Sequence, residues 1–154
     1  MKIFLTAFFA IILLSGCANK NAFSQFNMGT EQEKAIENTI SSKMLANNKI
    51  GGIFSAIYLN NIYKEMDKNT QKFYISIFMK ESQDKIEVSL NNEEPIESKK
   101  LSNYNKYSSL LPMKNQWTKN YLVTFKSTLD SNLSLSIDSG QFSSGPLKYS
   151  INPQ

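Results

Sequence analysis

The sequence predicts a mainly β domain, an antiparallel β-sandwich with one amphipathic helix at its N-terminal end. Six segments rich in β-branched and aromatic residues support this class, and most of them alternate between apolar and polar positions. Segments rich in Asn, Asp, Gly and Pro separate them, as expected for turns. We expect strands at 53–60, 72–79, 85–91, 120–127, 132–138 and 147–151. Short strands with one polar face favour a sandwich, and an immunoglobulin-like arrangement is the specific expectation.

The alternation and the spacing of two of these strands predict how they face and pair. In 132–138, Leu133, Leu135 and Ile137 alternate with serines, which predicts one buried face. The short connection back to 120–127 predicts that these two strands form a hairpin. One segment stays ambiguous, because residues 53–66 also place large apolar side chains at helical spacing and could form a helix instead.

A helix is predicted to begin at Thr30–Glu33, which has the pattern of a capping box. Ile36, Ile40 and Met44 follow at four-residue spacing and form an apolar stripe, which Ala35 and Leu45 join. Asn47-Asn48 and then Gly51-Gly52 would end the helix. We interpret this stripe as the face that covers the domain's own sheet. The alternative is a helix that docks on a membrane or a partner.

The stretch 101–118 is a long connection between strands. Tyr104, Tyr107 and Trp117 lie on it and Tyr121 follows, so these four aromatic residues are a candidate interaction surface for a protein or a glycan. The alternative is that Trp117 fills one end of the sandwich core.

The chain starts with a basic residue, Lys2, and an apolar run from Ile3 to Leu14. This run is shorter than the roughly 20 apolar residues that span a bilayer, so it is typical of a secretion signal. Leu14-Ser15-Gly16-Cys17 then places two small residues before the only cysteine.

This segment resembles the lipobox of bacterial lipoproteins. The resemblance implies cleavage between Gly16 and Cys17, and a diacylglycerol and a further acyl chain such as palmitate on Cys17. We therefore expect a signal peptide at 1–16, a lipidated cysteine and tether at 17–29, and a single β-rich domain at 30–154. Ala18 is unlike the aspartate that retains such proteins on the inner membrane. The resemblance thus implies the outer membrane in a two-membrane bacterium, facing the periplasm or the surface.

The composition limits the chemistry that this chain can perform. It contains no histidine, its 17 basic residues are all lysines, and the net charge is +4. An imidazole base, a nucleophile paired with histidine and an arginine clamp are therefore excluded, and we expect no cofactor and no metal. The basic residues are spread along the chain, which argues against a nucleic-acid partner.

These observations predict a lipid-anchored binding or assembly module of the cell envelope, held in the membrane through Cys17 and acting through protein or glycan contacts. Two alternatives stay open. Glu93-Glu94 are paired carboxylates that a glycoside hydrolase would need, although such a pair in "NNEEP" is more typical of an exposed turn. The domain could also be purely structural.

Overall fold

The computed structural model describes residues 28–81, 85–111 and 116–151. Over these residues the chain forms one short α-helix, one 3-10 turn and nine strands, all paired antiparallel. In chain order the elements are α2 (Thr30–Glu37), β1 (Thr39–Ala46), β2 (Lys49–Tyr58), η2 (Leu59–Asn61), β3 (Thr70–Met79), β4 (Glu87–Leu90), β5 (Glu97–Leu101), β6 (Lys119–Lys126), β7 (Asn132–Ser139), β8 (Phe142–Ser144) and β9 (Leu147–Ser150).

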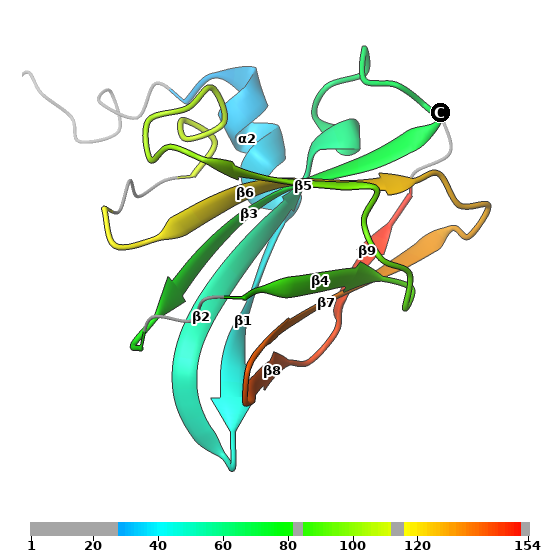
Figure 1. Cartoon of the computed structure of the whole chain (residues 1–154). Coiled ribbons are helices and arrows are strands. Elements are labelled where there is room, and N and C mark those ends of the chain that lie inside the picture. The colour runs from blue at the N-terminus through cyan, green and yellow to red at the C-terminus, as the bar shows by residue number, and fades with distance from the viewer. Residues whose placement is uncertain (1–27, 82–84, 112–115, 152–154) are drawn as a thin grey trace, which may run out of the picture.

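The strands form one continuous sheet in the order β4-β7-β8-β1-β2-β3-β6-β5, and β9 pairs with β7 beside β8. Its two edge strands, β4 and β5, are joined only by residues 91–96. Because so short a connection links opposite edges, the sheet curls into the half-barrel of Figure 1. The mainly β, antiparallel class is confirmed. An immunoglobulin-like sandwich is not confirmed, because all nine described strands belong to this single sheet.

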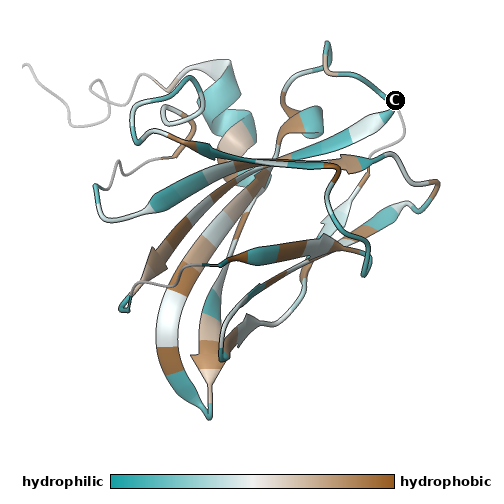
Figure 2. Cartoon of the chain, viewed as in Figure 1, coloured by the Kyte–Doolittle hydropathy of each residue, from teal (hydrophilic) through white to brown (hydrophobic). Residues whose placement is uncertain are grey.

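The larger core fills the inside of the curl. Figure 2 shows apolar residues along β2 and β3, the strands in the middle of the sheet. Four aromatic rings meet there: Phe73 lies 5.1 Å from Tyr58, 6.0 Å from Phe125 and 5.3 Å from Tyr149, measured between ring centroids. Leu133, Leu135 and Ile137 are fully buried in the same core, which confirms the predicted alternation of 132–138.

A second, smaller core lies on the outer face of β2 and β3. Ile57 and Tyr74 point outward from these strands and are covered by Ala35 of α2 and by Tyr107 and Leu110. The Gln32 side chain donates to the backbone oxygen of Ser109 at 2.8 Å, which ties α2 to the segment 102–111. Figure 1 shows both at the same end of the sheet. The helix covers the domain's own sheet, as interpreted from the sequence.

The predicted extent of this helix is wrong. It ends at Glu37, and 39–46 is the strand β1, where Met44 faces the inner core. A spacing of four residues satisfies the helical period, but it is also an even number, so Ile40 and Met44 share one face of a strand equally well. Ile36, the third member of the predicted stripe, is 47% exposed.

The helix cap also differs from the prediction. Gly29 is the N-cap, and its backbone N–H donates to Oε1 of Gln32 at 3.2 Å. Gln32 therefore has the role that the sequence assigned to Glu33, and Thr30 is the first helical residue.

The predicted hairpin between 120–127 and 132–138 is wrong as well. β6 pairs with β3 on one side and β5 on the other, so both of its edges are occupied. β7 instead pairs with β4, β8 and β9. The ambiguous segment 53–66 is the end of β2 followed by η2, not a long helix.

Candidate functional site

Two of the four candidate aromatic residues are on the surface. The residues that precede them in the sequence are joined by a hydrogen bond. Tyr104 is 85% exposed and Trp117 is 70% exposed. Nδ2 of Asn103 donates to the backbone oxygen of Gln116 at 3.0 Å, so the neighbours of the two aromatic residues are in direct contact. We call Tyr104 and Trp117, together with the preceding residues Asn103 and Gln116, the aromatic site.

Side-chain amides, one of them buried, hold the aromatic site against the sheet. Nδ2 of Asn120, a 3% exposed residue on β6, donates to Oδ1 of Asn103 at 3.1 Å. Nδ2 of Asn105 donates to the backbone oxygen of Ser102 at 2.7 Å and to the hydroxyl of Tyr74 on β3 at 3.3 Å. The segment that presents Tyr104 is therefore fixed by side chains of two strands.

The other two candidates lie elsewhere. Tyr107 is 4% exposed and packs against Tyr74 in the outer core, 5.7 Å between ring centroids, with Nζ of Lys106 4.7 Å from its ring. Tyr121 is half-buried and packs against the inner core, and its burial raises the pKa of its hydroxyl. Of the four candidates, only Tyr104 and Trp117 are exposed and follow residues that are hydrogen-bonded to each other. The alternative that Trp117 fills the core is wrong, since most of its side chain is exposed.

Several candidates fall outside the part that the structure describes. The lipobox residues Leu14-Ser15-Gly16-Cys17, with the lipidation and cleavage positions, lie before residue 28. Among the residues it does describe, no helix has the length and apolar character that crossing a membrane requires.

Glu93 and Glu94 lie on the exposed turn after β4. Asn91 and Asn92 have φ angles of 52° and 66°, and the backbone of Leu90 and Glu93 is joined by hydrogen bonds in both directions. This is the tight hairpin geometry in which Asn tolerates a left-handed backbone. Over residues 28–81, 85–111 and 116–151, no group of three or more Asp, Glu, His or Cys side chains is arranged to hold a metal ion.

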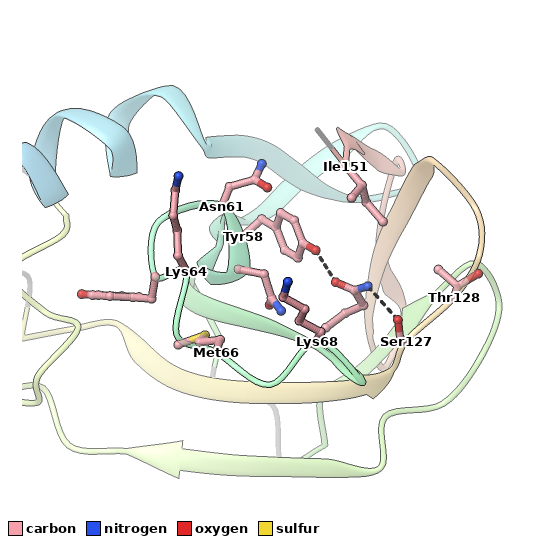
Figure 3. A pocket seen from close by; sticks show the side chains of 11 residues that line it. Tyr58, Asn61, Lys64, Met66, Lys68, Ser127, Thr128 and Ile151 are labelled. Atoms are coloured by element: carbon pink, nitrogen blue, oxygen red, sulfur yellow. Dashed lines mark hydrogen bonds between the residues drawn. The ribbon is translucent and has the colours of Figure 1, made fainter. Parts of the chain in front are cut away.

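Sequence reasoning missed a hollow at the open end of the half-barrel, above the aromatic rings of the inner core. Its volume is about 240 Å³. Figure 3 shows Lys64 and Met66 on one side of it and Ser127 and Thr128 on the other. We call it the mouth hollow. Its lining residues are Tyr58, Asn60, Asn61, Tyr63, Lys64, Met66, Lys68, Gln71, Ser127, Thr128 and Ile151.

A partly buried polar network forms the wall of the mouth hollow. The hydroxyl of Tyr58 donates to Oε1 of Gln71, and Nε2 of Gln71 donates to Oγ of Ser127 at 3.5 Å (Figure 3). Gln71 is only 5% exposed, although it is polar. Burial raises the pKa of Tyr58 to about 12, so its hydroxyl keeps its proton and remains a donor at neutral pH.

No motif marks the mouth hollow in the sequence, because its residues come from 58–71, 127–128 and position 151. Only the sheet order brings these segments to one end of the molecule. The one local signal is Gln71, a polar residue at an inward position of a strand.

Comparison of the chain with known protein families, with curated proteins and with solved structures finds no match. Functional inference for this protein therefore starts from its own residues.

Proposed function

We propose that this protein is a lipid-anchored binding module of the cell envelope, and that the aromatic site contacts a partner protein or a glycan. The observation that carries the proposal is the exposure of Tyr104 and Trp117 beside a fixed polar network. Large aromatic side chains dominate the energetics of many interfaces because they combine a wide apolar surface with one polar group.

The support beneath the aromatic site favours binding. Asn103 is held from β6 and Asn105 from β3, so the loop backbone is already ordered before a partner arrives. A partner that covers the two rings then loses less conformational entropy than it would on a mobile loop. The exposed side-chain amide of Gln116, next to Trp117, adds hydrogen-bonding capacity that suits glycan hydroxyls or a polypeptide backbone.

The lipobox supplies the membrane part of the proposal. Two or three acyl chains on Cys17 bind a bilayer far more strongly than one chain, because each buried methylene contributes ~0.8 kcal/mol. Residues 18–29 span at most roughly 40 Å when extended, so the domain would work close to the membrane surface.

The experiment on the aromatic site compares Tyr104→Ala and Trp117→Ala in the full-length lipidated protein. Cross-linking in native membranes reports protein partners, and co-sedimentation with isolated cell wall reports glycan binding. We expect each variant to weaken one of these interactions about tenfold, the loss that corresponds to 1.4 kcal/mol. Leu129→Ala removes a fully exposed apolar side chain elsewhere and is the control. Unchanged binding in both assays for both aromatic variants would contradict the proposal.

A separate experiment tests the anchor. Cys17→Ser should release the protein from membranes or leave it unprocessed, because the leader alone is too short to span a bilayer. A variant that still matures and stays with membranes in high salt would overturn the lipoprotein assignment.

Density separation of the wild type tests the outer-membrane location, which a wholly inner-membrane distribution would refute.

A further inference from the structure

We propose that the mouth hollow is a second binding site, separate from the aromatic site, for a small hydroxyl-rich anion of the size of one sugar acid or sugar phosphate. Three properties of the hollow lead to this ligand class: the charge of its lining, the hydrogen-bonding groups on its wall, and its volume. None of them depends on Tyr104 or Trp117.

The charged residues that line the hollow are all basic. Lys64 and Lys68 both line the hollow, and no aspartate or glutamate does. In the described part of the chain, neither lysine takes part in an ion pair; the ion pair found there joins Lys85 to Glu87 on β4. Two ammonium groups at the rim of a concave surface attract an anion more strongly than the same groups on a flat surface, because the low-dielectric walls focus their field. The ligand should therefore carry a carboxylate or phosphate.

The wall of the hollow offers directed hydrogen bonds. Nε2 of Gln71 has two N–H groups, and its bond to Ser127 is long, at 3.5 Å, so this amide can still donate to a ligand. Asn61 is held through Nδ2, which donates to Oδ1 of Asn38 at 2.7 Å, and this leaves its own Oδ1 as an acceptor. A donor and an acceptor in the same lining suit hydroxyl groups, which both donate and accept.

The geometry of the wall is fixed by the fold. Nδ2 of Asn60 donates to the backbone oxygen of Thr70 at 2.8 Å, and its Oδ1 accepts from the backbone N–H of Lys72 at 2.8 Å. The Asn60 side chain thus makes both a donor and an acceptor bond to the backbone of β3, as the backbone of a paired strand does. These two bonds hold η2 in place. A site with such support loses little entropy when a ligand binds.

The volume limits the ligand. Pockets for drug-sized molecules measure roughly 300–1,000 Å³, and the mouth hollow measures about 240 Å³. It therefore suits one sugar-sized ring or a smaller acid. Met66 and Ile151 give the lining an apolar part, against which the C–H face of a ring could pack.

The test uses isothermal titration calorimetry of the full chain in detergent micelles. Glucuronate and glucose 6-phosphate are the probes; they separate the carboxylate from the phosphate form of the ligand. Glucose provides the hydroxyls without charge, and inorganic phosphate provides charge without the ring. We expect one of the two charged sugars to bind, and to bind at least about tenfold more tightly than glucose or phosphate. Added salt should weaken that binding, since partly exposed charges are screened.

The variant Lys64→Gln/Lys68→Gln should reduce this binding at least about tenfold, because it removes both cations while keeping similar side-chain length. Lys43→Gln/Lys148→Gln makes the same change in total charge at exposed strand positions outside the hollow, and it should bind as the wild type does. All four lysines are exposed, so both variants should melt like the wild type.

Three results would overturn the inference. If glucose binds as tightly as the charged sugars, the lysines do not select the ligand. If inorganic phosphate binds as tightly, the hollow recognises the charge alone. If neither charged sugar binds, or if both double variants lose binding equally, the mouth hollow is not the site. The aromatic site has its own variants, so these failures would leave the proposed function intact.

Discussion

The hydroxyl of Tyr149 on β9 donates a hydrogen bond to the backbone oxygen of Ala56 on β2, at 2.7 Å. In the sheet, β9 pairs with β7, whereas β2 lies between β1 and β3. The bond therefore crosses the inside of the half-barrel and ties the C-terminal strand to the middle of the sheet. Burial raises the pKa of Tyr149, which keeps this hydroxyl protonated as a donor.

Tyr149→Phe should lower the free energy of unfolding by about 1 kcal/mol, since it removes one buried hydrogen bond and keeps the ring. Tyr149→Ala should cost about 3–5 kcal/mol, because the ring also packs 5.3 Å from Phe73. Urea denaturation of both variants measures the difference. Equal losses would show that the packing of the ring contributes nothing beyond the hydrogen bond.

Adjacent positions on β7 should respond in opposite ways to the same charge. Leu135 is fully buried, so Leu135→Asp should unfold the domain, because an unpaired charge in the core costs several kcal/mol. Ser134 is half-buried on the other face, directly opposite Lys148 of β9. Ser134→Asp should be tolerated, since it creates a pair of opposite charges across the strands. Thermal melts decide this, and similar melting temperatures would contradict the orientation of β7.

Gly52 on β2 has no room for a side chain. A Cβ there would lie 2.4 Å from the sulfur of Met79 and 2.6 Å from the backbone oxygen of Phe78. Met79 can move, but the backbone of the neighbouring strand cannot shift without breaking its ladder. Gly52→Ala should therefore destabilise the domain by about 1–3 kcal/mol. Gly145→Ala, where nothing lies within 4 Å, should not, and equal chemical denaturation midpoints for the two would refute the prediction.

Stability should fall at alkaline pH because of two tyrosines beside the mouth hollow. The pKa of Tyr58 rises from 10.0 to about 12 through burial, and that of Tyr63 rises to about 12 through burial first and then the charge of Glu31. An unfolded chain releases these protons near pH 10, whereas the folded chain holds them until about pH 12. The unfolded state then binds fewer protons, so the free energy of unfolding decreases across this interval and is unaffected below it.

Tyr58→Phe provides the measurement. The variant should be less stable than the wild type at neutral pH, since it loses the hydrogen bond to Gln71, but its stability should decline less steeply above pH 10. Chemical denaturation over a pH series gives both quantities. If the free energy of unfolding falls equally steeply above pH 10 in the variant and the wild type, the pKa of Tyr58 is not raised in the folded protein.

Local pattern predicted individual strands of this fold, but not their neighbours. The alternation around Leu135 and the turn at Asn91-Asn92 could both be predicted from the sequence, because each depends on a few adjacent residues. The partners of β6 could not be predicted. β3 and β5 pair with its two edges, and the short loop to β7 does not show that these strands pair with β6 in place of β7. β5 has few apolar residues to mark it, as expected of a charged edge strand.

The candidate sites divide in the same way. Tyr104 and Trp117 could be proposed from the sequence, because long connections often carry exposed aromatic residues. The hydrogen bond that joins the residues before them, Asn103 and Gln116, could not be predicted from their spacing. The mouth hollow could not be proposed at all, since Gln71 and Ser127 meet only through the pairing of β3 with β6.

Removing the residues of the proposed anchor should leave the domain folded. A shortened chain that begins at Met28 keeps the Gly29 cap, α2 and all the described strands, so it cuts through neither core. It should fold cooperatively and give a mainly β circular dichroism spectrum. Its melting temperature should not respond to reductant, because the only cysteine has been removed. Chelator should also leave it unchanged, because the described residues contain no metal-binding group. A non-cooperative melt would show that residues before Met28 contribute to the fold, and a chelator-dependent melt would reveal a metal site.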